Sequence, residues 1–213
     1  MAKPASEKEI SFGTLRITVL PRVYEPAEDS FLLATYASSL SGSVLEIGCG
    51  SGIVSLSAAQ ASPKNIVLGV DINPKAVKCA SENARANGIK NATFAISDLF
   101  SNVPSSQKFD FILFNPPYLP TTRAERLLSP EENAAYDGGA SGLNVFKKFI
   151  AEAPAHLADG GKVAVIATSL GNGVEKTLAM LTLRVGDARV LAEEKFFFEK
   201  LALIEVSKPY GKP

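Results

Sequence analysis

The spacing of hydrophobic positions predicts a chain in which strands alternate with helices. Hydrophobic and polar residues alternate through Leu15, Ile17 and Val19, which is the period of a half-buried strand. Further along, short hydrophobic runs are followed by segments with a broader hydrophobic face at helical spacing. The later predicted strands are residues 43–47, 66–70, 92–96, 109–114 and 163–167, and the predicted helices are residues 27–40, 51–61, 74–87, 143–156 and 174–183.

The last part of the chain follows a different pattern. Residues 185–192 and 198–206 have the hydrophobic content of two strands, and their connection is too short for a crossover helix, so they should pair antiparallel. The whole pattern predicts an α/β fold with a doubly wound, seven-stranded, mostly parallel sheet, a Rossmann-like arrangement that ends in an antiparallel hairpin. A ligand should bind beyond the carboxyl ends of the strands, at the topological switch point.

Composition narrows the class of protein. The 213 residues include 22 Lys and Arg and 22 Asp and Glu, and 46% of them are hydrophobic. This is typical of a single domain, 1–213, in which we expect residues 1–10 to be flexible, 11–40 to form an N-terminal strand and helix, and 41–213 to form the core. The neutral charge argues against nucleic acid or a membrane as a partner. The chain shows no secretory leader and no apolar run of about 20 residues, so we predict a cytoplasmic location.

Cysteine and histidine are too scarce for metal or disulfide chemistry. The chain contains two cysteines, Cys49 and Cys79, and a single histidine, His156. This excludes a structural zinc site and a disulfide framework, and we predict no metal ion. Cys49 is interpreted as a small loop residue and Cys79 as a core residue of its helix. His156, near a helix end, is predicted to lie on the surface.

A glycine-rich loop follows strand 43–47. Gly48, Gly50 and Gly52 permit positive φ angles and let a ligand approach the backbone closely. The dinucleotide-binding pattern requires glycine at position 53, where this chain has Ile53, so a pyrophosphate cradle is not supported. The alternative is a glycine turn that serves only the packing of strand against helix.

Two carboxylates at neighbouring strand ends favour a cationic ligand. Glu46 ends the first strand of the sheet, and Asp71 follows the second, where a carboxylate can accept hydrogen bonds from both hydroxyls of a ribose. Together they would repel a phosphate-rich ligand. S-adenosylmethionine matches this site, because it carries a sulfonium, an ammonium and a ribose but no phosphate.

A third carboxylate follows strand 92–96. Asp98 would accept a hydrogen bond from the adenine amine, and Leu99 would pack on the adenine ring. An Asp in a loop is also common as a turn-forming residue. Its place at the carboxyl edge of the sheet favours binding.

The fourth strand ends in Asn115-Pro116-Pro117-Tyr118. Asn-Pro often opens a turn, but two successive prolines after a buried strand also remove two N–H donors and leave carbonyl oxygens for a ligand. A substrate NH2 group would donate to the Asn115 side-chain oxygen and the Pro116 carbonyl, and Tyr118 would stack on a planar amide or base. Catalysis would come from aligning that nitrogen with a sulfonium methyl group, without a strong general base.

At these residues the chain resembles class I methyltransferases that modify amide or exocyclic amino nitrogens and share an Asn/Asp-Pro-Pro-aromatic motif. Two further segments, Tyr24-Glu25-Pro26-Ala27-Glu28-Asp29-Ser30 and Ala135-Tyr136-Asp137-Gly138-Gly139, make it similar to the HemK-related class 2 branch of archaea and eukaryotes. Members of that branch are glutamine methyltransferases of class I translation release factors. The resemblance extends from about Leu20 to Val206.

The resemblance implies a site and a substrate. S-adenosylmethionine would be the methyl donor and S-adenosylhomocysteine the product. The acceptor would be the glutamine of a Gly-Gly-Gln loop in a class I release factor, bound by Asn115, Pro116, Pro117 and Tyr118. The residues implied in cofactor binding are Ser30, Glu46, Gly48, Gly50, Asp71, Asp98, Leu99 and Asn115.

The resemblance also implies a partner. A small zinc-binding activator protein would pair with the sheet edge at strand 92–96. Ala92, Phe94 and Ile96 would otherwise form an exposed apolar edge.

Two other functions stay open from the residues alone. The same tetrapeptide serves methylation of the exocyclic adenine N6 in nucleic acid, although neutral charge and the lack of a target-recognition domain argue against it. A non-catalytic cofactor-binding scaffold would not need Asn115 to Tyr118 intact. Because the cofactor fold would use almost the whole chain, we expect substrate recognition to come from residues 119–141, the Tyr24 segment and a partner.

Overall fold

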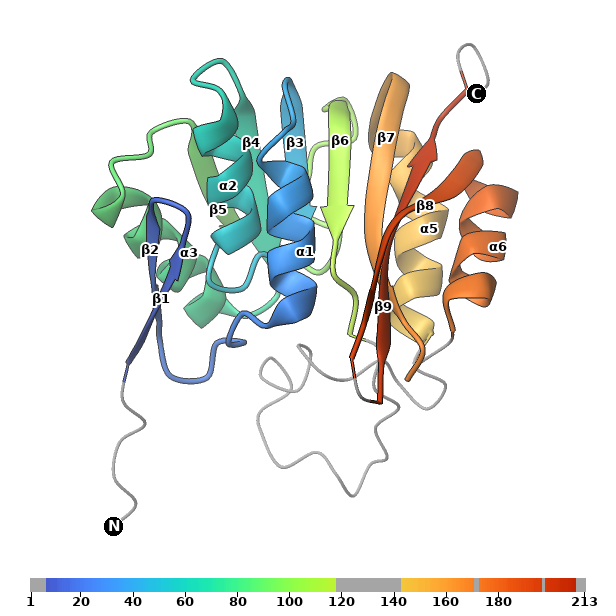
Figure 1. Ribbon diagram of the computed structural model, residues 1–213. Coiled ribbons are helices and arrows are strands. Elements are labelled where there is room, and N and C mark those ends of the chain that lie inside the picture. The colour runs from blue at the N-terminus through green and yellow to red at the C-terminus, as the bar shows by residue number, and fades with distance from the viewer. Residues whose placement is uncertain (1–6, 118–142, 171–172, 197, 210–213) are drawn as a thin grey trace.

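The computed structural model describes residues 7–117, 143–170, 173–196 and 198–209 (Figure 1). Among these residues, one sheet contains seven strands: β3 (Ser43–Ile47), β4 (Ile66–Asp71), β5 (Ala92–Ile96), β6 (Phe109–Phe114), β7 (Leu157–Thr168), β8 (Asp187–Lys195) and β9 (Lys200–Ser207). Their order is β5-β4-β3-β6-β7-β9-β8. β3 to β7 pair parallel, and β9 runs antiparallel to both β7 and β8. This confirms the predicted fold class.

Helices cover both faces of the sheet. α1 (Glu28–Ala37), α2 (Ile53–Ala61) and α3 (Pro74–Ala86) share one buried hydrophobic cluster, and α5 (Asn144–His156) and α6 (Val174–Arg184) share the other (Figure 1). Successive side chains of the central strands point to opposite faces of the sheet, so Val44 lies in the first cluster and Leu45 in the second. Within the described part of the chain, no helix is long and apolar enough to cross a membrane.

The described residues before β2 form a strand that was not predicted. Lys8–Phe12 forms β1, which pairs antiparallel with β2 (Leu15–Val19) in a separate two-stranded sheet. The expected flexibility of residues 1–10 stays a prediction. Gly13 makes the turn possible with φ 57°. Leu15, Ile17 and Val19 are buried in the first hydrophobic cluster. In β1, Ile10 and Phe12 are partly buried against the same cluster, and the Phe12 ring stacks on Phe31 with 5.9 Å between centroids.

Two asparagine side chains of α3 hold the hairpin against the sheet. The Asn83 Oδ1 accepts from the Thr18 N–H at 2.9 Å, and its Nδ2 donates to the Thr18 carbonyl at 2.9 Å. One helical turn later, Asn87 makes the same pair of bonds with Arg16, at 2.9 and 2.8 Å. The two amides thus replace a neighbouring strand along the second edge of β2.

Two corrections concern the region around β7. The strand predicted at residues 163–167 begins earlier in the chain, because β7 starts at Leu157. The register passes from Phe109 opposite Leu157 to Phe111 opposite Lys162, so the extra residues form a bulge that Gly160 permits with φ 72°.

His156 is buried rather than on the surface. Its side chain is 7% exposed, and its ring stacks on Phe100 with 4.7 Å between centroids. Because α5 passes directly into β7, the last residue of the helix turns inward. Burial lowers the pKa of His156.

We expect Asn83→Ala to lower the free energy of unfolding by about 2–3 kcal/mol, because it removes the Asn83 partner of the Thr18 N–H and leaves the Thr18 carbonyl only the weak thiol donor of Cys79. Asn87→Ala, at a more exposed position, should cost about half as much. Urea unfolding of both variants checks this. An Asn83 variant no less stable than the Asn87 variant would contradict it.

Candidate active site

Four parallel strands bring the predicted site residues to one edge of the sheet. β5, β4, β3 and β6 are consecutive neighbours that run in the same direction, so their carboxyl ends meet (Figure 1). Glu46 lies in β3, Asp71 ends β4, and Asp98 and Asn115 follow β5 and β6. The chain moves outward from β3 to β5 on one side and from β6 to β7 on the other, which places the switch point between β3 and β6.

The glycine loop connects β3 to α2 through three positive φ angles. Gly48, Gly50 and Gly52 have φ of 71°, 53° and 88°. A Cβ on Gly52 would lie 2.9 Å from the Cβ of Ala80, so that glycine serves the packing of α3. A Cβ on Gly50 would meet nothing within 4 Å, so the loop is open to a ligand there. Because Gly52 is left-handed, α2 begins at Ile53 and not at residue 51 as predicted.

Glu46 is a buried carboxylate tied to the start of α2. Its side chain is 4% exposed, and its Oε2 accepts from the Ser55 N–H at 2.8 Å and from the Ser55 hydroxyl. These bonds supply the cap that Gly52 cannot give the helix. Burial raises the pKa of Glu46 to about 8, opposed by the Ser55 hydrogen bonds and assisted by the charge of Asp71.

Asp71 connects β4 to the glycine loop. Its Oδ2 accepts from the Gly50 N–H and its Oδ1 from the Asn73 N–H, each at 2.9 Å. Burial raises the pKa of this carboxyl as well. Two carboxylates whose charged forms are disfavoured by burial gain most from a cationic ligand, in agreement with the sequence argument.

The turn after β5 is strained and braced. Leu99 has φ 49°, in the left-handed region that side chains rarely adopt. The Ser97 hydroxyl donates to the Leu99 carbonyl at 2.8 Å and accepts from the Asn102 N–H at 3.0 Å. Asp98 is thereby held at an exposed position, while the Leu99 side chain joins the second hydrophobic cluster. The predicted contact of Leu99 with adenine stays a prediction.

Asn115 has a fixed amide with one unused acceptor. Its Nδ2 donates to the Asp29 Oδ2 at 2.9 Å, while its Oδ1 is buried without a hydrogen-bond partner among the described residues. A buried acceptor of this kind matches an N–H donor from a substrate. Pro116 is buried and Pro117 partly buried beside it, and Tyr118 lies outside the described residues.

Asp29 is the residue that sequence reasoning missed. Acidic residues in the first turn suit the positive end of a helix, and the exposed Glu28 fits this role. Asp29, however, is 3% exposed and accepts hydrogen bonds from Tyr24 and Asn115. Ser30, predicted to bind the cofactor, donates its hydroxyl to the Asp29 Oδ1 at 3.1 Å. The only signal in the sequence was the Tyr24 to Ser30 segment as a whole.

The cysteines take no part in this chemistry. Cys79 is a buried core residue of α3, as predicted. Cys49 is buried in the glycine loop, where burial raises the pKa of its thiol and so disfavours a nucleophilic thiolate. The described residues contain no group of three or more His, Cys, Asp or Glu side chains that could hold a metal ion.

Solved structures share this fold. The 16S rRNA N2 G1207 methyltransferase RsmC of T. thermophilus, solved with AdoMet and guanosine, matches with a TM-score of 0.72 and 23% identity over 95% of this chain and 50% of that one. The Mtq2–Trm112 complex of E. cuniculi, described as responsible for methylation of the eRF1 translation termination factor, matches with a TM-score of 0.65 and 24% identity over 88% of this chain and 99% of that one. These likenesses show the fold, a Rossmann-like α/β sheet that ends in antiparallel strands and that both methyltransferases share.

Sequence relatives narrow the class. The family model "Methyltransferase small domain" matches residues 27–129. The chain is 44% identical over 196 residues (92% of this chain and 96% of the relative) to MJ0928 of Methanocaldococcus jannaschii, whose name gives an inferred protein N5-glutamine methyltransferase activity. It is 36% identical over 169 residues to methyltransferase HEMK2 of Homo sapiens, over 75% of this chain and 78% of the relative. The chain therefore belongs to the HEMK2- and MJ0928-like family of protein N5-glutamine methyltransferases.

The raised pKa of Glu46 predicts a pH-dependent affinity for S-adenosylmethionine. Below about pH 8 the free protein holds a proton on Glu46, and a cation beside it favours the carboxylate, so binding releases the proton and strengthens as pH rises toward 8. We expect the Kd to fall by up to about tenfold per pH unit between about pH 6 and 8. Calorimetry should use Glu46→Gln as the reference, because the ligand's own amino group titrates near pH 8. Parallel curves for both proteins would contradict the prediction.

Proposed function

We propose that this protein transfers a methyl group to the side-chain amide of the glutamine in the Gly-Gly-Gln loop of a class I translation release factor. The observation that carries the proposal is the Asn115 Oδ1, a buried acceptor without a partner among the described residues, at the switch point of a methyltransferase sheet. The family of the chain, in which protein glutamine is the named acceptor, supports it. A cytoplasmic location belongs to the same proposal.

The residues of the edge divide between the two ligands. When bound, S-adenosylmethionine supplies the methyl group as a sulfonium and leaves as S-adenosylhomocysteine. Glu46 and Asp71 would face its positive charge and its ribose, Gly50 would allow close approach of the backbone, and Asp98 would accept from the adenine amine. The remaining proposed cofactor contacts are Ser30, Gly48, Leu99 and Asn115.

The substrate amide would bind at the end of β6. One of its N–H groups would donate to the Asn115 Oδ1 and the other to the Pro116 carbonyl, with Pro117 and Tyr118 beside it. Two such bonds would orient the nitrogen lone pair toward the methyl donor. The N–C bond would form as the S–C bond of the sulfonium breaks, and the nitrogen, then cationic, would lose one proton to solvent. Orientation of this kind supplies most of the rate enhancement that the site needs.

Incubation with labelled S-adenosylmethionine and a class I release factor tests the proposal. We expect label on the Gly-Gly-Gln glutamine by mass spectrometry, loss of label when that glutamine is changed to Ala, and about 100-fold slower transfer by Asn115→Ala. Gln60→Ala, which removes an exposed amide of α2, is the matched control and should leave the rate unchanged. Label that appears on duplex or single-stranded nucleic acid instead, or on neither substrate, would overturn the proposal.

A partner at the β5 edge is the second part of the proposal. β5 ends the sheet and, in the described part of the chain, pairs with β4 alone. Phe94 was expected to be exposed on this edge, but it is partly buried. Its ring packs over Gly69, where an added Cβ would lie 2.6 Å from the Phe94 Cδ1. The apolar exposure lies at Ile96, which is 51% exposed. A free edge with this side chain suits strand addition by a small zinc-binding activator protein.

Ile96→Lys tests this edge, because a charge on an edge strand opposes pairing with another chain. We expect the variant to lose at least about tenfold in affinity for the activator in pull-down and calorimetry, with its thermal stability unchanged. Leu183→Lys, on the exposed face of α6, is the control. Equal binding by both variants would exclude the β5 edge.

A further inference from the structure

The Asn115 amide has only one orientation in which it can satisfy Asp29. An ionised carboxylate accepts hydrogen bonds and donates none, so the Asn115 NH2 group must face the Asp29 Oδ2, which lies 2.9 Å from it. The amide oxygen must then point the other way, which is where the unpartnered buried Oδ1 lies. The direction of the substrate-facing acceptor is therefore decided by a residue 86 positions earlier in the chain.

Asp29 is itself held in place from both sides. Its Oδ2 also accepts from the Tyr24 hydroxyl at 2.9 Å. Its Oδ1 accepts from the Ser30 N–H at 2.6 Å and the Ser30 hydroxyl at 3.1 Å. At 3% exposure a carboxylate is costly to bury without such donors. The first turn of α1 thus holds a rigid negative group against the end of β6, and Glu28 beside it stays exposed.

We propose that Asp29 is a positioning residue that locks the Asn115 amide with its oxygen toward the methyl acceptor. The lock makes the site select a substrate that presents an N–H there over one that presents an oxygen. The identity of that substrate rests on the function proposed above, but the lock itself is a property of the free protein. Asp29 acts through Asn115 and needs no contact with the substrate.

Asp29→Asn removes the lock with little change in shape. An amide at position 29 can offer either oxygen or NH2, so Asn115 is free to turn its own NH2 toward the substrate. We expect the kcat for glutamine methylation to fall about 10- to 100-fold, because the charge-assisted hydrogen bond that orients the Asn115 amide is lost. Glu152→Gln makes the same acid-to-amide change at an exposed position of α5 and should leave the kcat unchanged.

A charge swap separates positioning from folding. Asn115→Asp alone places two carboxylates against each other and should be at least as impaired as Asp29→Asn. In the double variant Asp29→Asn/Asn115→Asp, the new amide donates to one carboxylate oxygen and the second oxygen faces the substrate. We expect its kcat to recover to within about tenfold of the wild type. A double variant no better than the worse single variant would overturn the proposal.

The side-chain 15N–1H signals of Asn115 give a readout that needs no substrate. In protein labelled with 15N-asparagine, the signals that disappear in Asn115→Asp belong to this amide. One of its protons should be shifted downfield and exchange slowly in the wild type and Glu152→Gln, and should lose both properties in Asp29→Asn. If the wild type fails to methylate glutamine while this pattern holds, the proposed function fails and the lock stands. If Asp29→Asn keeps both the pattern and the kcat, the lock is refuted.

Discussion

The parallel pairing of β3 with β4 on one side and β6 on the other is the constraint on which the rest of this structure depends. In register, Glu46 lies opposite Gly69 and Leu113, so the three strands end together and their loops emerge from one edge. The loop after β3 is then fixed to β4, where Gly48 and Cys49 donate to the Val70 carbonyl. Polar side chains at the ends of these strands share a small space, which is why the proposed site is placed at this edge of the sheet.

The electrostatics of the edge follow from its burial. Burial raises the pKa of Glu46 and of Asp71 although donors reach both side chains, so a positive charge beside them would favour their ionised forms. Asp29 differs in that one of its donors is the side-chain amide of Asn115. The three acidic side chains therefore differ in role: Glu46 and Asp71 would face a cationic ligand, and Asp29 fixes the Asn115 amide. The net charge of the whole chain is zero, so the acidic character of this edge is a local feature.

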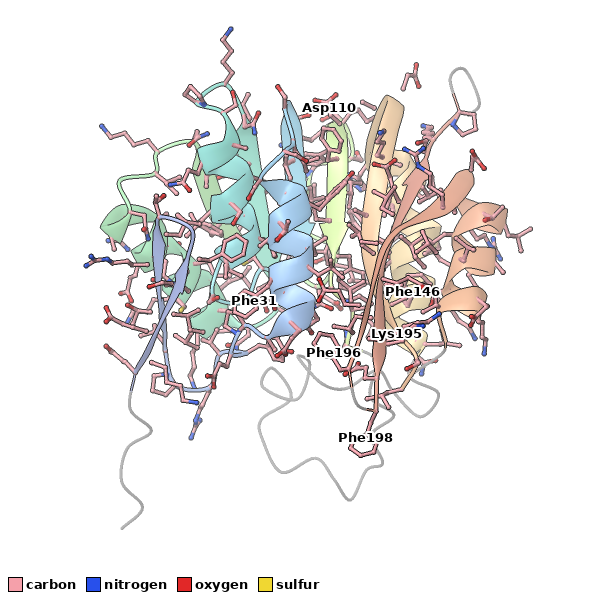
Figure 2. The ribbon with its side chains drawn as sticks, in the orientation of Figure 1. Phe31, Asp110, Phe146, Lys195, Phe196 and Phe198 are labelled. Carbon is pink, nitrogen blue, oxygen red and sulfur yellow. The ribbon has the colours of Figure 1, made fainter. Side chains whose placement is uncertain are left out.

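Segments outside the central sheet complete the site from a distance. Asn83 of α3 and the C-cap residue Asn87 tie the hairpin β1–β2 to that helix. In the segment that follows the hairpin, Asp29 accepts hydrogen bonds from Tyr24 and from Asn115 at the end of β6. Figure 2 shows Phe31 of α1 and Phe146 of α5 in the half of the molecule where β6 ends. The hydrogen bonds of Asn83 to Thr18 and of Asn115 to Asp29 join residues that are 65 and 86 positions apart. The geometry of the proposed acceptor site therefore depends on how the N-terminal region packs against the rest of the protein.

The sequence by itself determined the alternation of elements, the fold class and the strand ends at which site residues occur, because hydrophobic period, glycine spacing and prolines are local signals. Glu46, Asp71, Asp98 and Asn115 were placed at strand ends in this way. Tertiary structure alone decided the burial of His156, the bulge in β7, the packing of Phe94 and the role of Asp29. Each of these depends on a partner far away in the chain. A buried carboxylate and an exposed one look the same in a sequence, since the difference lies in which distant donors surround them.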